Sequence, residues 1–429
     1  MNDNSRGMLF YRILAGTALL AYSPVALVRS ITGRRRLGDL RGRLGRLDWP
    51  SLAGGIWVHA VSVGEVGVAA ALLSALARKA PDRRLGVSVT TEAGRDLAPR
   101  VLPPEVAVFA FPLDLARPVE RALDEVQPGL VLLTETELWP LFIDRAARRG
   151  VPIALVNGRI SERSYPRYRM LKRWFSSTLE SVSLFVMQSE EDARRIESLG
   201  VPPSRIRMKG NLKYDVPPAP PFRDGERLMA AAAGRPIVVA ASTAEGEEEA
   251  VVDAWKRLTP RPLLAIAPRR PERFEEVAKK IEAAGFSLLR ATRGDPARGD
   301  VYLLDTIGEL ASLYLHAKIA FVGGSLVARG GHNPIEAWSA GVPVLVGPHV
   351  ENFREIVEKG RSLGIVHRVA DAQDLSRALG KRLADPAATA ASGAVARKFV
   401  AGNRGSADAT ADEVLTLLSR APARRGAAG

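Results

Sequence analysis

Residues 56–79 have the sequence IWVHAVSVGEVGVAAALLSALARK, and this stretch decides the fold. Its first six residues, 56–61, form a short apolar run typical of a buried strand, and residues 68–79 carry a helical pattern. Gly64 stands at the turn between them, where a residue without a side chain permits unusual backbone angles. Gly64 and Gly67 do not complete the GxGxxG fingerprint of a dinucleotide site. The stretch therefore predicts a strand–turn–helix unit of a parallel α/β fold.

The same alternation of apolar runs and helical segments continues along most of the chain. The other predicted strands are residues 85–90, 106–111, 130–134, 153–157, 184–188, 237–241, 263–267, 301–304, 319–323 and 344–346. Helical segments between them include residues 117–126, 140–149, 168–181, 271–284 and 333–340. Such alternation indicates βαβ units that build parallel sheets.

A proline-rich stretch, VPPAPP at residues 216–221, interrupts the alternation. Proline cannot continue a helix or a central strand, so this stretch predicts a semi-rigid linker between two domains. We expect an α/β protein whose two Rossmann-like domains face a cleft, with the ligand site at the carboxyl ends of the strands. The predicted parts are an N-terminal membrane anchor and basic cluster (1–46), a first domain (47–215), a linker (216–235), a second domain (236–410), and a C-terminal helix end with a basic tail (411–429).

Composition excludes several classes of protein. The 429 residues include 61 Lys and Arg against 47 Asp and Glu, which gives a formal net charge of +14 at pH 7. The hydrophobic fraction of 46% is that of a globular protein rather than a disordered, collagen-like or polytopic membrane protein. The absence of cysteine excludes a disulfide scaffold, a thiolate metal site and cysteine catalysis. The basic excess predicts an anionic partner.

Much of this positive charge follows an apolar segment near the N-terminus. Residues 13–28 carry no charge, and residues 29–46 contain seven arginines and one acid. A transmembrane helix needs ~20 apolar residues, so a spanning helix is borderline, and an interfacial helix or a cleaved signal peptide are the alternatives. Positive charge just after the apolar run disfavours the signal peptide because it opposes translocation. We predict a membrane anchor with the body of the protein on the cytoplasmic side, and no nucleic-acid partner, since the sequence contains no motif for one.

Three motifs of the first domain carry candidate catalytic side chains. HAVSVGE, residues 59–65, places Glu65 at the start of a helix, where it either takes part in chemistry or only complements the helix dipole. TETELWP, residues 134–140, has two acids after a buried strand; carboxylates there are costly unless paired, and a helix N-cap is the alternative interpretation. Lys213, in the motif GNLKYD, suits a developing phosphate charge, with a surface lysine as the alternative.

The second domain has the residues of a nucleotide-sugar site. Residues 267–274, APRRPERF, follow a predicted strand and offer guanidinium groups to a phosphate. Residues 305–310, DTIGEL, open a predicted helix. The glycine-rich residues 323–336 end with Pro334 in the first turn of a helix, whose backbone N–H groups can bind phosphate, and with Glu336, which can accept ribose hydroxyls.

No group of residues has the spacing of a metal site. The five histidines are scattered through the sequence, and no DxD motif follows a predicted strand. We therefore expect a reaction that needs neither a metal nor another cofactor.

Residues 163–174, RSYPRYRMLKRW, interleave five basic residues with aromatic side chains. We interpret this segment as a contact for lipid phosphates or headgroups. An amphipathic helix with solvated arginines is the alternative.

The ordered motifs together resemble a known family. HAVSVGE, TETELWP, NGRIS followed by RS, GNLKYD, PRRPERF, DTIGEL, FVGGSLV with GGHNPIE, and GPHVENF are similar to those of the 3-deoxy-D-manno-octulosonic acid (Kdo) transferases of lipopolysaccharide assembly. Those enzymes are inverting glycosyltransferases of the two-Rossmann GT-B type. The similarity extends from about residue 8 to about residue 410.

The resemblance implies CMP-Kdo as the donor, a phosphorylated lipid A precursor of the lipid IVA type as the acceptor, and the cytoplasmic face of the inner membrane as the location. It makes Glu65 the catalytic base, and Glu135 and Lys213 the residues that stabilise the transition state. The implied CMP-binding residues are Pro268, Arg269, Ile307, Gly308, Glu309, Asn333, Pro334, Ile335 and Glu336.

The chain departs from the family pattern at two positions. Arg270 stands where the family usually has His, and Gly158 where it has Ala. The first lies beside the implied nucleotide site and affects its fine contacts. Two other functions stay open at this point: another membrane-associated GT-B enzyme that uses a different nucleotide sugar, and a non-catalytic nucleotide-binding membrane protein.

Overall fold

The structure is a computed structural model of the chain, and it describes residues 42–44, 49–162, 164–217, 219–293 and 299–420. The predicted anchor at residues 13–28, most of the arginine cluster and the basic tail after Arg420 lie outside these residues. The chain divides into two compact units. Unit 1 extends to Asp215 and resumes at Asn403, and unit 2 is Val216–Gly402.

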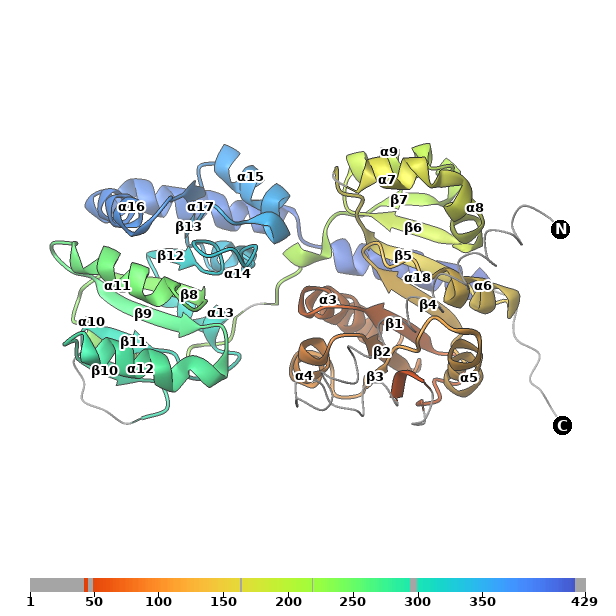
Figure 1. The fold of residues 1–429 in the computed structure, drawn as a ribbon, viewed down its shortest axis with the longest axis horizontal. Helices are drawn as coiled ribbons and strands as arrows, with labels where there is room; N and C mark the ends of the chain where they lie inside the picture. Colours follow the sequence, from red (N-terminus) through yellow and green to blue (C-terminus); the bar gives the residue numbers. More distant parts are fainter. Residues whose placement is uncertain (1–41, 45–48, 163, 218, 294–298, 421–429) are drawn as a thin grey trace, which may run out of the picture. The chain divides into compact units, whose positions relative to one another are not determined.

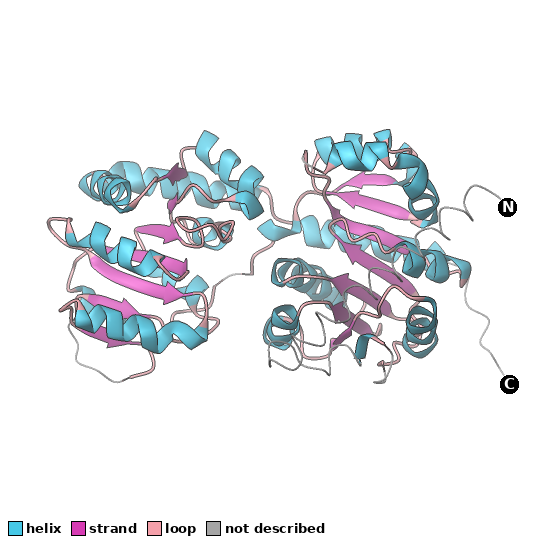
Figure 2. Ribbon diagram, in the orientation of Figure 1, coloured by secondary structure: helices cyan, strands magenta, loops and turns pink. Residues whose placement is uncertain are grey.

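Unit 1 is built on a seven-stranded sheet in the order β3-β2-β1-β4-β5-β6-β7 (Figures 1 and 2). Every neighbouring pair is parallel, as the sequence predicts. The strands are β1 (Ile56–Ala60), β2 (Leu85–Val89), β3 (Ala107–Ala110), β4 (Leu130–Thr134), β5 (Ile153–Gly158), β6 (Leu184–Met187) and β7 (Ile206–Met208). This is the order of a doubly wound Rossmann-like sheet, which starts in the centre and grows to both sides.

Helices cover both faces of this sheet (Figure 1). They are α3 (Val63–Lys79), α4 (Glu92–Val101), α5 (Ala116–Val126), α6 (Pro140–Arg148), α7 (Tyr165–Met170), α8 (Lys172–Ser181), α9 (Glu190–Ser198) and α18 (Ser406–Arg420). Strand β1 shows why two layers are needed, because its alternating side chains point to opposite faces. Ile56 and Val58 belong to the core with α3 and α18, whereas Trp57 belongs to the core with α5 and α6.

Unit 2 repeats the architecture with a second seven-stranded parallel sheet, in the order β10-β11-β9-β8-β12-β13-β14. Its strands are β8 (Ile237–Thr243), β9 (Leu263–Pro268), β10 (Leu288–Arg290), β11 (Val301–Leu303), β12 (Ile319–Val322), β13 (Val344–Val346) and β14 (Val366–Arg368). Its helices are α10 (Gly225–Ala232), α11 (Glu247–Lys256), α12 (Phe274–Ala283), α13 (Leu310–Leu313), α14 (Ile335–Ser339), α15 (Arg354–Ser362), α16 (Ala372–Ala384) and α17 (Pro386–Gly402).

The segment predicted as a linker, residues 216–235, is shorter in the structure. Helix α10 occupies residues 225–232 and belongs to unit 2. Its sequence GERLMAAA is rich in strong helix formers, and its Leu228 and Ala231 are buried. Burial of that apolar face therefore extends unit 2 back into the predicted linker.

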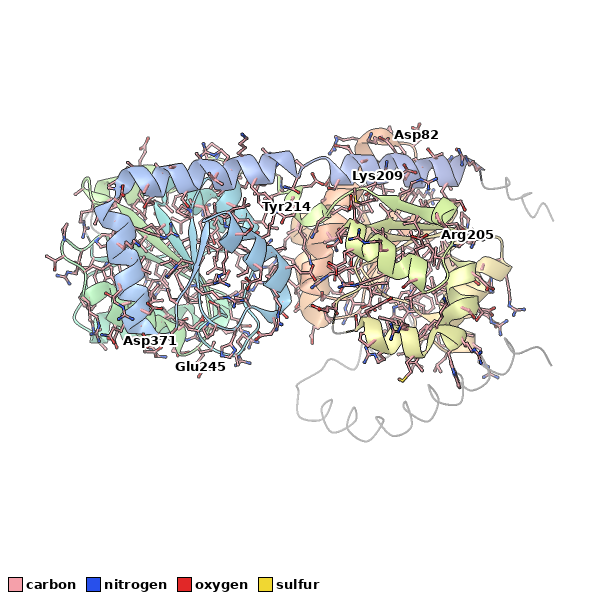
Figure 3. The ribbon with its side chains drawn as sticks, turned by 90° about the horizontal axis from the view of Figure 1, so that it is seen from above. Asp82, Arg205, Lys209, Tyr214, Glu245 and Asp371 are labelled. Atoms are coloured by element: carbon pink, nitrogen blue, oxygen red, sulfur yellow. The ribbon has the colours of Figure 1, made fainter. Side chains whose placement is uncertain are left out.

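The second domain was expected to reach residue 410, but the chain returns to unit 1 at Asn403. The Asp215 carboxylate accepts hydrogen bonds from the backbone N–H groups of Gly405 (2.6 Å) and Ala407 (2.7 Å) and so caps the start of α18. Ala407 and other apolar side chains of α18 then complete the core beside α3. Lys209 (Figure 3) adds an ion pair of 2.8 Å with Glu413 on the same helix.

The predicted amphipathic segment at residues 168–181 is two helices rather than one. Leu171 separates α7 from α8 and has non-helical backbone angles of φ −95° and ψ 13°. In the part of the chain that the structure describes, no helix is long and apolar enough to span a bilayer.

Candidate active site

Glu65 lies at the carboxyl end of β1, inside the first turn of α3, and is 6% exposed. Ser62 is the N-cap residue, and the pattern Ser62-x-x-Glu65 is a capping box. The Glu65 carboxylate accepts hydrogen bonds from the Val61 N–H, the Ser62 hydroxyl and the Thr134 hydroxyl, each at 2.9 Å. Glu65 therefore stabilises the N-terminus of α3. The same contacts fix its carboxylate at the end of the sheet.

Burial raises the pKa of Glu65 above its usual value, and the nearby carboxylate of Glu135 raises it further. The hydrogen bonds from Val61, Ser62 and Thr134 act in the opposite direction, because they stabilise the charged form. A carboxylate with a raised pKa is a stronger proton acceptor than an exposed one, which suits a general base.

Glu135 directly follows β4 and has a left-handed backbone conformation, with φ of 55°. Its N–H donates to the carbonyl oxygen of Val156 on β5 (2.9 Å), which holds this unusual turn in place. The Lys213 ammonium lies 2.7 Å from a Glu135 carboxylate oxygen. The structure thus brings Glu65, Glu135 and Lys213 together from three motifs that are far apart in sequence.

A chain of amide hydrogen bonds places Lys213. Asn157 accepts a hydrogen bond from the Leu212 N–H through its side-chain oxygen (3.0 Å), and Asn211 accepts one from the Lys213 N–H (2.9 Å). The Gln188 side chain links the two, because it donates to the Asn157 carbonyl oxygen and accepts from the Asn211 amide, both at 2.8 Å. Asn157 and Gln188 were not among the predicted site residues, although both stand at strand ends, where polar side chains gather.

His59 of the HAVSVGE motif is a structural residue. It is fully buried, stacks on Phe111 with ring centroids 3.7 Å apart, and hydrogen-bonds through Nδ1 with Ser88. Burial lowers the pKa of His59 to about 3, so the ring is neutral at physiological pH. Because the His59 imidazole is neutral and fully buried, we do not assign it a role in proton transfer. The candidates for that role at this edge are the carboxylates.

Glu137, the second acid of TETELWP, is a residue of this site to which the sequence analysis gave no role. Its side chain is half-buried, and burial, followed by the charges of Glu65 and Glu135, raises its pKa to about 7. The signal in the sequence is the second acid itself, two residues after Glu135 and directly behind a buried strand.

In unit 2, Glu247 organises the glycine-rich loop after β12. This fully buried carboxylate accepts hydrogen bonds from the N–H groups of Ala244 (2.8 Å), Gly324 (2.6 Å), Ser325 (2.9 Å) and Leu326 (2.8 Å). The sequence analysis did not single out this residue, although an acidic run directly after β8 was a visible signal.

Two of the predicted CMP-binding segments come together beside this loop. Pro268 ends β9, and the Arg269 N–H donates to the Thr243 carbonyl oxygen (3.0 Å). Asn333 caps the backbone before the short helix α14 by accepting from the Ile335 N–H (3.0 Å). Burial raises the pKa of Glu336 in α14, and the positive charge of Arg269 partly offsets this effect.

The third predicted segment, Ile307 to Glu309, follows β11, which lies two strands from β8 in the sheet. Gly308 has a φ of 88°, and the Ile307 side chain is 52% exposed. The Glu309 carboxylate accepts a hydrogen bond from Thr306 and lies 3.5 Å from the Arg223 guanidinium. Glu309 therefore contacts Thr306 in its own loop and Arg223 in the segment before α10.

No group of three or more His, Cys, Asp or Glu side chains among the described residues could hold a metal ion. The metal-independent reaction stays a prediction.

Two Rossmann-like units, one with carboxylates and a lysine at its sheet edge and one with a glycine-rich loop and Arg269, define a protein of the GT-B fold class. The same fold occurs in the UDP complex of MnaA from S. aureus, which matches 86% of this chain and 98% of its own with 16% sequence identity and a TM-score of 0.56. Identity at this level shows the fold alone.

Sequence similarity to known proteins identifies the family. Residues 35–216 match the family described as 3-deoxy-D-manno-octulosonic-acid transferase (kdotransferase), and residues 297–399 match glycosyl transferases group 1. The 3-deoxy-D-manno-octulosonic acid transferase of Bordetella pertussis is 35% identical over 86% of this chain and 89% of its own length. That of Haemophilus influenzae is 34% identical over 79% and 81%. This chain belongs to the Kdo transferase family and is a Kdo glycosyltransferase.

Proposed function

We propose that this enzyme transfers Kdo from CMP-Kdo to a phosphorylated lipid A precursor of the lipid IVA type, with inversion at the anomeric carbon, at the cytoplasmic face of the inner membrane. The observation that carries the proposal is the arrangement of the buried Glu65 carboxylate beside the ion pair of Glu135 and Lys213. A base and a fixed charge pair suit the transfer of a sugar to a hydroxyl.

Glu65 acts as the general base. It removes the proton from an acceptor hydroxyl while that oxygen attacks the anomeric carbon of Kdo from the face opposite the phosphate. The new carbon–oxygen bond forms as the bond from carbon to the CMP phosphate oxygen breaks, and CMP leaves with the bonding electron pair. Because the Thr134 and Ser62 hydroxyls fix the Glu65 carboxylate, it needs little reorganisation to accept the proton.

Lys213 and Glu135 stabilise the transition state, in which negative charge develops on the departing CMP phosphate. The 2.7 Å ion pair holds the Lys213 ammonium in one place, so that its positive charge is fixed before the reaction begins.

Unit 2 binds the nucleotide. We assign CMP to Pro268 and Arg269, to the segment from Ile307 to Glu309, and to the segment from Asn333 to Glu336. Support comes from the hydrogen bonds of the Arg269 N–H and of the Asn333 side chain, and from those of Glu247, which hold the glycine-rich loop that leads to Asn333. The Arg269 guanidinium supplies positive charge for the phosphate, and Glu336 accepts the ribose hydroxyls.

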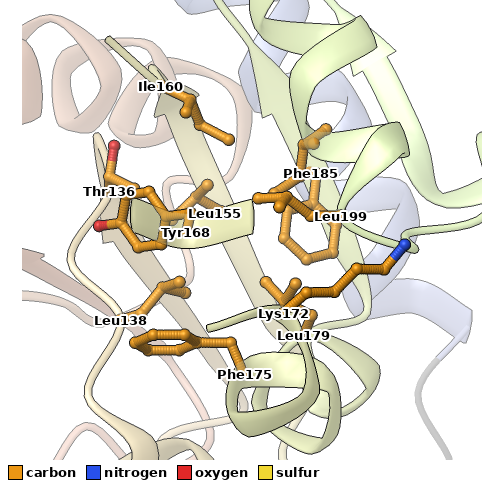
Figure 4. Close-up of a pocket in the computed structure, with 11 residues that line it drawn as sticks. Thr136, Leu138, Leu155, Ile160, Tyr168, Lys172, Phe175, Leu179, Phe185 and Leu199 are labelled. Atoms are coloured by element: carbon orange, nitrogen blue, oxygen red, sulfur yellow. The ribbon is translucent and has the colours of Figure 1, made fainter. Parts of the chain in front are cut away.

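Helices α7 and α8 contact the acceptor or the lipid that surrounds it. Arg167, Arg169 and Arg173 give this segment positive charge, and its Met170 and Trp174 side chains are 77% and 51% exposed. An apolar cavity lies beneath it, where Tyr168 and Phe175 approach Leu138 from the TETELWP loop (Figure 4). Exposed aromatic and basic side chains in one segment suit a phosphorylated, acylated surface. The predicted anchor, residues 13–28, adds a second attachment to the same membrane.

The test is a transfer assay with radiolabelled CMP-Kdo and a bisphosphorylated lipid A precursor, followed by NMR of the product. Labelled lipid with an inverted anomeric centre supports the proposal. A dephosphorylated precursor is expected to be a poorer acceptor. Transfer from a different nucleotide sugar but not from CMP-Kdo, or retention of configuration, contradicts the proposal.

A further inference from the structure

Glu137 lies in the same edge of unit 1 as the three proposed catalytic residues. It belongs to the loop between β4 and α6, and its N–H lies 3.4 Å from the carbonyl oxygen of Thr134. The hydroxyl of that same Thr134 donates to Glu65 (2.9 Å), so the loop and the proposed base are directly connected. Glu137 is therefore placed next to the reacting groups by backbone structure, not by a flexible side chain alone.

The three acids of this edge differ in their contacts. The Glu65 carboxylate accepts three hydrogen bonds from the protein, and the Glu135 carboxylate is paired with Lys213. The half-buried carboxyl group of Glu137 has no hydrogen-bond or ion-pair partner in the part of the chain that the structure describes. Of these three, Glu137 has the most hydrogen-bonding capacity left for a substrate.

The charges around Glu137 favour its protonated form. Glu65 approaches from α3 and Glu135 from the same loop, both as carboxylates, while Tyr168 approaches from α7. The ammonium of Lys213 is paired with Glu135. A third carboxylate therefore adds an uncompensated negative charge in a partly buried position, which is why the pKa of Glu137 rises to about 7.

We propose that Glu137 is an acceptor-binding residue: as a neutral carboxylic acid it donates a hydrogen bond to an oxygen of the acceptor sugar, and by staying neutral it admits an anionic acceptor beside Glu65. This inference rests on the proposed function. It gives two carboxyl groups at one edge different roles: Glu65 accepts a proton, and protonated Glu137 donates a hydrogen bond.

Glu137→Gln and Glu137→Ala separate this role from a merely structural one. Glutamine keeps the shape and a donor but cannot ionise, whereas alanine has neither property. The measurement is kcat/KM for the lipid acceptor from pH 6 to pH 9 at saturating CMP-Kdo, with KM for CMP-Kdo determined alongside. Glu190→Gln, a change of an exposed acid in the first turn of α9, is the matched control.

Wild-type kcat/KM for the acceptor is expected to fall as pH rises above about 7, since Glu137 ionises. The ratio of E137Q to wild type should therefore grow by about tenfold for each pH unit above the pKa. E137A should be weaker than E137Q by about tenfold at pH 6, from the loss of one hydrogen bond. KM for CMP-Kdo should stay the same in all variants. A constant ratio of E137Q to wild type across the pH range, or an effect on KM for CMP-Kdo alone, overturns the inference.

The experiment distinguishes failure of the proposed function from failure of the role of Glu137. A wild-type enzyme that does not transfer Kdo to the lipid A precursor overturns both ideas. A wild-type enzyme that is active, with E137Q following the same pH dependence, overturns the role of Glu137 alone.

Discussion

Replacing Glu247 by glutamine tests how the donor loop is held. The carboxylate accepts four backbone hydrogen bonds of 2.6–2.9 Å, two on each oxygen, and a longer one of 3.5 Å from the Val327 N–H. Glutamine replaces one oxygen by an NH2 group, which turns two of these contacts into donor facing donor. A hydrogen bond to a charged group contributes about 1.5–3 kcal/mol, so the loss of two predicts a destabilisation of about 3–6 kcal/mol. This is a large part of the ~5–15 kcal/mol by which a domain is stable.

The assay is urea unfolding followed by tryptophan fluorescence, since Trp255 and Trp338 of unit 2 are buried reporters. The matched control is Glu245→Gln, a change of an exposed acid two residues away (Figure 3), which should alter the free energy of unfolding by less than about 0.5 kcal/mol. In folded E247Q, KM for CMP-Kdo should rise, because the loop that leads to Asn333 loses its support. A destabilisation below about 1 kcal/mol together with an unchanged KM would refute this reasoning.

Three further predictions concern unit 1. Gly158→Ala should lower the free energy of unfolding by about 1–3 kcal/mol, because the new Cβ would lie 2.5 Å from the buried Met187 sulfur. Chemical denaturation measures this change, and an unchanged stability would contradict the prediction. The raised pKa of Glu137 means that its contribution to stability is complete below about pH 4.5 and is lost as pH rises through about 7, a change of at most ~3 kcal/mol. E137Q should therefore be more stable than wild type above pH 7, and thermal unfolding at pH 5 and pH 8 that shows equal effects would count against the raised pKa. Lys213→Met should lower kcat by about 10²–10³-fold with little change in KM for CMP-Kdo, since it removes the fixed charge paired with Glu135; steady-state kinetics that show only a KM effect would argue for a binding role.

The sequence was sufficient to predict most strands of the parallel sheets, because these strands are short apolar runs with clear ends. The strands β7, β10 and β14 were not predicted, because each has only three residues and one of the three is an arginine. The prediction for residues 130–134 matches β4 residue for residue. The grouping of Glu65, Glu135 and the GNLKYD motif also follows from such ends, since carboxyl ends of parallel strands share one edge. The sequence could not predict that α18 returns to unit 1, because this depends on contacts of Asp215 with residues almost 200 positions later.

Local sequence patterns also could not predict the burial, hydrogen-bond partners and protonation of individual side chains. The capping box at Ser62 is visible in the sequence, but the third hydrogen bond of Glu65, from Thr134, depends on the pairing of β1 with β4. The same holds for Glu137 and Glu247, whose surroundings come from several strands. The burial and the partners of a carboxylate decide its chemistry, and both are properties of the folded sheet edge.

The central claim is that Glu65 is the base of Kdo transfer, and Glu65→Gln tests it most directly. Transfer of radiolabelled Kdo from CMP-Kdo to the lipid A precursor should fall by about 10²–10⁴-fold in E65Q, while CMP binding measured by calorimetry stays at the wild-type level and E190Q keeps full activity. Near-wild-type transfer by folded E65Q would contradict the account.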